Sequence, residues 1–324
     1  MEEIISLIKE ACELCSSQGY TKAPPNLLYH YCAVNSFYKI IESKKIHVSE
    51  ALYTNDSAEI IWGKNKAGVI FQDIENQSKG QNLQPALRKM YDSYNLNLDC
   101  GSPYIFCLSE NGDLLSQWRS YAEDAAGFSI GLTVDTLCKG LNIKFKEQTH
   151  LMGGGDPIFV LNPVVYDDQL QDILIRICVK IGLIEVDNGI FDEILPQWEL
   201  LPFKLYFRRQ STSDGIVNAA INLCHLSFIF KNKGFVEEKE WRIMVTPNRI
   251  FPADKILGRY VKSFKVNAGI IKPFMEIDFK DIPGLLGSVM FGPRNKNIVP
   301  IVGLFLEQNG FKSIEIKKSI VSYR

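Results

Sequence analysis

Residues 236–245 read Val-Glu-Glu-Lys-Glu-Trp-Arg-Ile-Met-Val and carry the most informative pattern in the chain. The run predicts a β-strand, although five of the seven residues 237–243 are charged. Because alternate side chains of a strand point to one face, Glu238, Glu240 and Arg242 would lie together. Two carboxylates beside an arginine suit a site that keeps a catalytic base ionised. A solvated charged face explains the same pattern equally well.

Outward from this strand, short apolar runs predict further strands at 27–32, 46–49, 104–108, 127–132, 159–166, 288–291 and 313–317. Helical spacing predicts helices at 3–17, 37–43, 114–121, 168–184, 191–210, 215–232 and 299–309, with weaker helical signals within 52–98. The two kinds of element do not alternate as βαβ units, so the class is α+β with a mixed or antiparallel sheet. Residues 1–20 are expected to form an N-terminal amphipathic helix. Residues 27–324 are expected to form one domain with a helical insertion at about 168–232.

The composition disfavours several classes of function but does not identify one. The chain has 324 residues, is 46% hydrophobic and 23% charged, and has a net charge of -1, which disfavours nucleic-acid binding through bulk positive charge. No apolar run approaches the roughly 20 residues that span a bilayer, and the acidic start is unlike a secretion signal. A cytoplasmic protein without membrane partners is expected. The scattered cysteines and histidines show no metal-ligand spacing, so no metal is expected.

Two aromatic groups are further candidates for a site. Tyr29-His30-Tyr31 lies on an early predicted strand, where a single histidine is more often a hydrogen-bonded core residue. Trp118 and Tyr121 are three residues apart on a predicted helix and share one face. Core packing explains that spacing, and so does an aromatic wall for a planar ligand. Asn55-Asp56 with Glu59 is typical of a helix cap.

These landmarks, in this order, resemble the bacterial DUF2971 family, whose name denotes a domain of unknown function. The resemblance covers roughly residues 27–324, and Asn55-Asp56-Ser57 departs from the family's usual Asn-Asp-Pro. The segments that carry it are Leu28–Tyr31, Asn55-Asp56 with Glu59, Phe106–Ser109, Trp118–Ala122, Gly127–Gly131, Glu238–Arg242, Phe291–Pro293 and Ser319–Arg324.

A second resemblance, to the ADP-ribosyltransferase superfamily, implies an activity. The order is similar: a histidine on an early strand, an aromatic residue in the middle, and Glu-x-Glu late. It implies that His30 holds the ribose of NAD, that Tyr121 stacks on nicotinamide, and that Glu240 is the catalytic carboxylate with Glu238 as its partner. The implied NAD-contacting residues are His30, Tyr31, Trp118, Tyr121 and Arg242.

The resulting expectation is an NAD-consuming enzyme, such as a toxin or anti-phage effector, that transfers ADP-ribose to a protein or nucleic acid. Two alternatives stay open. A nucleic-acid-binding protein would use the basic and aromatic residues at 204–209 with Lys231 and Lys233, which a solvated helix face also explains. A non-catalytic module would dock on a partner or a second copy through the N-terminal helix.

Overall fold

The structure is a computed structural model that describes residues 2–20, 23–53, 58–79, 82–100, 103–141, 143, 158–184, 200–203, 215–246, 260–267 and 269–323. The strands are β1 (Leu27–Cys32), β2 (Lys45–Glu50), β3 (Tyr104–Ser109), β4 (Phe128–Thr133), β5 (Ile158–Pro163), β6 (Glu240–Thr246), β7 (Tyr260–Asn267), β8 (Ile270–Asp278), β9 (Leu286–Phe291) and β10 (Glu315–Lys318). The α-helices are α1 (Glu2–Ser17), α2 (Val34–Ser43), α3 (Ala58–Gln77), α4 (Gln84–Cys100), α5 (Leu115–Tyr121), α6 (Val134–Gly140), α7 (Asp168–Leu183), α9 (Gly215–Ser227) and α10 (Val299–Gln308). Two 3₁₀ helices are η1 (Ala51–Tyr53) and η2 (Lys233–Glu238).

The described strands form one ten-stranded sheet, and the predicted α+β class with a mixed sheet is confirmed. All pairs are antiparallel except β9 with β10. Strand β3 lies at the centre, because β6 pairs along one edge while β1 and β2 share the other. Strand β2 pairs at Tyr104 and Ile105, and β1 pairs at Ser109, so the two separate at opposite ends of β3.

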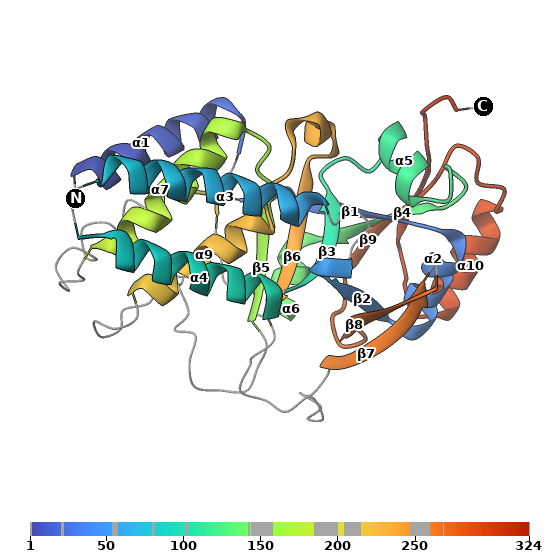
Figure 1. Cartoon of the computed structure of the whole chain (residues 1–324). Helices are drawn as coiled ribbons and strands as arrows, with labels where there is room; N and C mark the ends of the chain where they lie inside the picture. Colours follow the sequence, from blue (N-terminus) through green and yellow to red (C-terminus); the bar gives the residue numbers. More distant parts are fainter. Residues whose placement is uncertain are drawn as a thin grey trace.

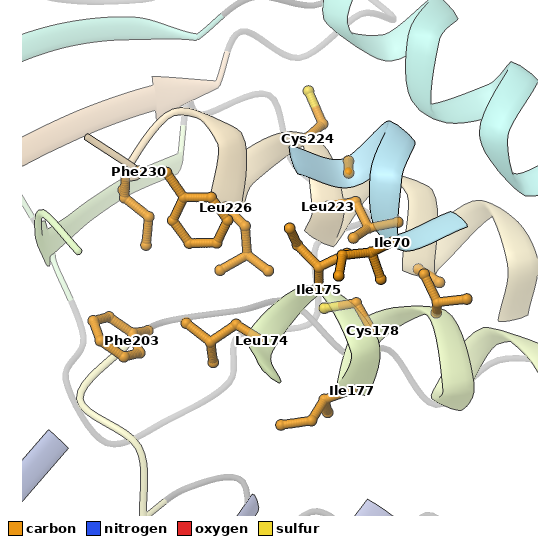
Figure 2. Packing of buried hydrophobic residues seen from close by; sticks show 14 of the residues in the cluster. Ile70, Leu174, Ile175, Ile177, Cys178, Phe203, Leu223, Cys224, Leu226 and Phe230 are labelled. Carbon is orange, nitrogen blue, oxygen red and sulfur yellow. The ribbon is translucent and has the colours of Figure 1, made fainter. Parts of the chain in front are cut away.

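Helices α1, α3, α4, α7 and α9 gather at one end of the molecule (Figure 1) and enclose the largest of three apolar clusters among the described residues (Figure 2). The amphipathic spacing of α1 buries Ile4, Ile8 and Ala11 in this core, and α1 packs on α7. Asp167 caps the N-terminus of α7, because its side chain accepts a hydrogen bond from the Leu170 N–H. The apolar face of α1 is therefore covered by the chain itself, rather than left for a partner as one alternative supposed.

The second core lies on the other face of the sheet, beneath α2, α6 and α10. It is built from alternate residues of the strands, such as Phe106 and Leu108 on β3 with Trp241 and Ile243 on β6. The sheet therefore separates two apolar layers. Polar residues occupy the part of the first face that the large helices leave uncovered.

The structure corrects the predicted strand at 236–245. The strand begins at Glu240, because residues 233–238 form η2 and Lys239 adopts a left-handed conformation with φ 41°. The side chain of Asn232 caps η2 by accepting from the Gly234 N–H. Glu238 therefore precedes the strand, and the alternation argument that paired it with Glu240 was wrong for this residue.

Other boundaries differ less. Helix α9 ends at Ser227 rather than 232, and the sequence analysis missed α6 and the hairpin of β7 and β8. The two predicted helices at 168–184 and 215–232 form within the proposed insertion, but they pack on α3 and α4 as part of the large core. Most of the helix predicted at 191–210 lies outside the described residues. None of the described helices is both long and apolar enough to cross a membrane.

Candidate functional site

Alternation along β6 and β3 places a set of polar side chains on one face of the sheet. Glu240 lies opposite Ser109, and Arg242 lies opposite Cys107. Strand β1 continues the row, because Tyr29 lies opposite Ser109. Partners that lie directly opposite share a face, so these five residues point to the same side. We call this side the cluster face and the opposite side, which carries Trp241 and Phe106, the core face.

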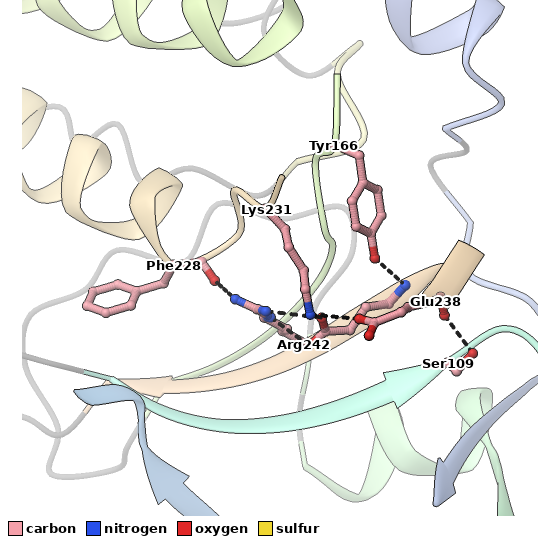
Figure 3. A network of polar contacts seen from close by, with 7 residues as sticks. Ser109, Tyr166, Phe228, Lys231, Glu238 and Arg242 are labelled. Carbon is pink, nitrogen blue, oxygen red and sulfur yellow. Dashed lines mark hydrogen bonds and ion pairs between the residues drawn. The ribbon is translucent and has the colours of Figure 1, made fainter. Parts of the chain in front are cut away.

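Four charged side chains form a buried cluster on the cluster face (Figure 3). Lys231 Nζ is 2.7 Å from Glu238 Oε2 and 3.2 Å from Glu240 Oε2. Arg242 Nε donates to Glu240 Oε1 at 2.8 Å, and a terminal nitrogen of its guanidinium donates to Glu240 Oε2 at 3.0 Å. These side chains are only 4–10% exposed. Two carboxylates and two cations leave the cluster with no net charge.

Hydrogen bonds to the backbone fix the cluster in place. Ser109 Oγ donates to the carbonyl oxygen of Glu238 at 2.7 Å, and the Glu240 N–H donates to the hydroxyl of Tyr166 at 3.0 Å. Arg242 donates from its remaining terminal nitrogen to the carbonyl oxygen of Phe228 at 2.7 Å (Figure 3). The cluster is therefore tied to β3, to the residues after β5 and to the end of α9.

The Glu240 carboxyl is held in its charged form. Burial alone would raise its pKa, but the positive charges of Arg242 and Lys231 outweigh burial and hold the pKa below its usual value of 4.5. Glu240 is therefore ionised at neutral pH. It meets the electrostatic requirement for a carboxylate that stabilises positive charge.

Helix α5 brings Tyr121 to the cluster. Burial and the nearby negative charge of Glu238 raise the pKa of Tyr121, and Glu240 and Cys107 act in the same direction. The ring is nonetheless 39% exposed, and the thiol of Cys107 is exposed on the same face. Tyr121 therefore lies within reach of the charges of Glu238 and Glu240.

Tyr31 and Trp118, two other residues that were expected to contact NAD, are instead used in packing. Trp118 is fully buried, its ring lies 4.8 Å edge-on from that of Tyr31, and its Nε1 donates to Asp113 at 2.7 Å. The Tyr31 hydroxyl donates to the carbonyl oxygen of Asn111 and accepts from the Leu114 N–H. These residues anchor α5 to β1. The guanidinium of Arg242 likewise donates to Glu240 and to the carbonyl oxygen of Phe228. It is therefore already paired within the protein rather than turned toward a ligand.

His30 lies on the core face, away from Glu240. It alternates with Tyr29 and Tyr31, and its ring lies 4.3 Å from that of Phe106. Its Nδ1 is 3.2 Å from the carbonyl oxygen of Cys107, and burial lowers its pKa to about 4, so the ring is neutral at pH 7. The expected convergence of His30 with Tyr121 and Glu240 does not form, because neighbouring residues of a strand point to opposite faces.

Glu240 also lines a cleft of about 680 Å³ at the end of β5 and β6. Three aromatic residues, Tyr20, Tyr166 and Trp241, line the same cleft, with charged residues around them. The charged lining residues besides Glu240 are Glu110, Asp167, Asp168, Lys233 and Lys239. Tyr121 does not line this cleft, so Glu240 lies between the cleft and the surface that Tyr121 and Cys107 occupy.

The sequence analysis missed Lys231, Cys107 and Tyr166 as parts of the site. Lys231 had been grouped with the basic segment at 204–209, but it is buried and ion-paired here, while that segment lies outside the described residues, as do Asn55 and Asp56. Cys107 occupies the β3 position directly opposite Arg242. Only the pairing of β3 with β6 reveals that, and nothing local in the sequence specifies it.

One comparison with known proteins gives a match. Residues 117–243 match the model of a family described as a protein of unknown function, DUF2971. No curated protein and no solved structure matches the chain. The matched segment runs from α5 to β6 and contains Tyr121, Lys231 and all of the cluster carboxylates. The part of the chain that builds the candidate site is therefore similar to the DUF2971 family.

Proposed function

We propose that the protein is an NAD-consuming enzyme that transfers ADP-ribose to a protein or nucleic-acid acceptor, or to water. In this reaction the bond between nicotinamide and ribose C1′ breaks, and its electron pair leaves with nicotinamide. The acceptor attacks C1′ and releases a proton. Positive charge develops on the ribose ring during bond cleavage, and an ionised carboxylate beside it lowers the barrier.

One observation carries the proposal: a partly exposed aromatic ring, Tyr121, lies within reach of the charge of a carboxylate that its surroundings keep ionised, Glu240. Nicotinamide is planar and stacks on aromatic rings. Glu240 is assigned the role of stabilising the ribose, and Glu238 is assigned the role of its Glu-x-Glu partner. The histidine role that the ADP-ribosyltransferase resemblance implies is left out, because His30 lies on the core face.

The cleft that Glu240 lines offers room for the rest of the substrate. Its volume of about 680 Å³ lies within the range of roughly 300–1,000 Å³ that is usual for ligand pockets. The three aromatic residues suit an adenine ring, and Lys233 and Lys239 are the cations that would meet the phosphates in a lining that also holds four carboxylates. A matched pair of variants tests this placement. Val236→Trp fills the cleft from an exposed position, whereas Val69→Trp puts the same ring at an exposed position on α3.

The direct experiment is nicotinamide release from NAD by the purified protein, alone and with cell extract. Tyr121→Ala should lower the rate at least tenfold, and the matched control Tyr38→Ala, at a similarly exposed tyrosine on α2, should not. Glu240→Gln should abolish release, with its folding checked by circular dichroism. In cells, expression of the wild type should lower the NAD content. The proposal fails if the wild type leaves NAD intact with every acceptor tested.

A second candidate function is a non-catalytic binding module. The observation that favours it is the balance of the cluster, in which every charged side chain has an internal partner of opposite sign. Such a cluster stabilises one arrangement of η2, β6 and α9 without any ligand. Under this alternative Glu240→Gln lowers stability, but the wild type has no nicotinamide release to lose.

A further inference from the structure

Lys265 and Lys272 form a pair of like charges on the hairpin of β7 and β8. The two residues lie directly opposite each other in the strand register, so their side chains are on the same face of the sheet. Lys265 Nζ donates to the hydroxyl oxygen of Ser49 on β2 at 3.2 Å, and Lys272 Nζ donates to the carbonyl oxygen of Tyr53 on η1 at 3.0 Å. Both acceptors are neutral, so these bonds fix the two ammonium groups in place without matching their charge.

The charges of this lysine pair are not compensated within the described residues. Neither Lys265 nor Lys272 forms an ion pair there, whereas Lys231 contacts the carboxylates of both Glu238 and Glu240. Burial and the positive charge of Lys272 lower the pKa of Lys265. Like charges directly opposite each other destabilise a pair of strands. An anion bound between the two ammonium groups would remove this repulsion.

A partly exposed aromatic ring, His47 on β2, lies beside the lysine pair. The imidazole is 4.3 Å from the ring of Phe274 at an angle of 31°, and Lys265 Nζ is 5.4 Å from the centre of the same ring. Phe274 is buried, but the side chain of His47 is 43% exposed, so the imidazole can still contact a ligand. We call Lys265, Lys272 and His47 the hairpin patch.

One carboxylate, Glu276, lies next to the hairpin patch. Its Oε2 accepts from Lys45 Nζ at 2.7 Å, and its Oε1 is 3.5 Å from His47 Nε2. Lys45 matches the charge of Glu276, so the charges of the lysine pair remain uncompensated. Figure 1 shows β2, β8 and β7 on the side of the molecule away from α1, and the patch shares no residue with the cleft that Glu240 lines. The hairpin patch is therefore a separate site.

The chemistry of the hairpin patch indicates a class of ligand. Two ammonium groups held side by side suit a phosphate, and an exposed aromatic ring stacks on a nucleobase. A base can stack on a side chain when it is unpaired, which favours a single strand over a duplex. A lipid surface fits less well, because segments that bind anionic lipids usually carry clusters of roughly 4–8 basic residues.

We propose that the hairpin patch binds single-stranded nucleic acid, with a phosphate between Lys265 and Lys272 and a neighbouring base on His47. This binding goes beyond the proposed function and does not depend on the consumption of NAD. It also uses different residues from the basic segment at 204–209 that the sequence analysis assigned to nucleic acid.

The test measures binding of a labelled single strand of about 12 nucleotides to the full chain by fluorescence anisotropy. Lys265→Gln and Lys272→Gln should each weaken binding by about fivefold or more at about 50 mM salt. The double variant should reduce the slope of log affinity against log salt by about 0.7, the value for one phosphate on a single strand. The matched control Lys139→Gln removes an exposed, ion-paired lysine on α6 and should change the affinity less than about twofold.

Two further measurements separate ligand binding from a structural role. His47→Ala should weaken binding about fivefold without changing the salt slope, because stacking releases no counterions, and His47→Phe should restore the affinity. The melting temperature of Lys272→Gln should stay equal or rise, because the change removes the repulsion with Lys265. A fall of several degrees would show that Lys272 serves the fold instead.

Three results would overturn the inference. The wild type may leave the strand unbound, both lysine variants may bind it as the wild type does, or anionic vesicles or inorganic phosphate may bind as tightly as the strand. The outcome is independent of the NAD assay. If NAD is consumed but the strand is not bound, this inference fails and the proposed function stands. If the strand binds through the hairpin patch but NAD stays intact, the proposed function fails and the binding site stands.

Discussion

The two faces of the sheet, compared at β1, β3 and β6, accommodate titratable side chains in different ways, although the residues are neighbours in the chain. On the core face, His30 packs on Phe106 as a neutral ring and the other side chains are apolar. On the cluster face, two carboxylates and two cations are buried, and each has an ion-pair partner of opposite sign. A core can therefore hold a titratable group either by neutralising it or by pairing it.

The largest expected effect comes from removing one partner on the cluster face. Arg242→Met leaves two buried carboxylates with a single lysine, and it should lower the free energy of unfolding by about 3–5 kcal/mol. Arg294, which pairs with Asp124 at the surface, is the matched control, and Arg294→Met should cost about 1 kcal/mol or less. Chemical denaturation measures both. Equal losses would mean that the cluster is no more important than a surface ion pair.

A double substitution makes the cluster face more like the core face. Lys231→Met alone leaves Glu238 without its cation, whereas adding Glu238→Met leaves only the Glu240–Arg242 pair, which is neutral. The double variant should be more stable than Lys231→Met by about 1–2 kcal/mol. Denaturant midpoints of the single and double variants measure this coupling. Additive losses would contradict direct pairing of Lys231 with Glu238.

Acidification should affect the two faces in different pH windows. The pKa of His30 falls from 6.5 to about 4 on folding, so between these values the unfolded chain binds a proton that the folded protein does not. Stability should therefore fall as the pH decreases from 6.5 to 4. His30→Gln should reduce that loss by about 1–2 kcal/mol, while the similar contribution of His225 remains.

Glu240 affects the stability of the protein at lower pH. Its pKa in the folded protein lies below 4.5, so the stability that it contributes is present above that value. Stability from the cluster should be lost only as the pH falls below about 4.5, and Glu240→Gln should flatten that part of the profile. Unfolding curves measured from pH 7 to pH 3 separate the two windows. A profile that His30→Gln leaves unchanged above pH 4.5 would contradict a buried neutral histidine.

The smallest effect is a difference in accessibility. Cys107 is exposed on the cluster face, whereas burial raises the pKa of Cys32 on the core face to about 12. A thiol reagent should therefore modify Cys107 rapidly and Cys32 only after unfolding. Cys107→Ser should remove one equivalent from the fast phase with little change in stability. An unchanged fast phase would show that the cluster face is covered at β3.

Local patterns predicted most elements and failed where pairing decides the structure. The run Leu27–Cys32 is a strand with the predicted bounds, because a short run of apolar and aromatic residues favours a strand. In contrast, Lys239 ends η2 with a left-handed turn that the run of charges does not reveal. The hairpin of β7 and β8 was also missed, although its two strands are adjacent in sequence; only the pairing of β8 with β2 is remote.

The candidate site shows the same limit. The sequence order of His30, Tyr121 and Glu240 resembles a known catalytic pattern, but order carries no information about which face of a strand a residue occupies. Glu240 was singled out by the charges within a predicted strand, and Tyr121 by its spacing from Trp118, while their roles came from the resemblance. Lys231 could not be predicted, because a lysine is an ordinary surface residue until its burial and partners are known.

The pairing of β2 with β8, two strands far apart in the sequence, has a consequence for synthesis of the chain. Strand β2 ends at residue 50 and pairs mainly with β8, which begins at residue 270. At about 5–20 residues per second, the ribosome needs roughly 10 to 45 s to make the 220 residues between them. During that interval β2 has no partner strand along its outer edge. Chaperones that shield exposed strand edges would therefore act on the first 50 residues long before the last strands emerge.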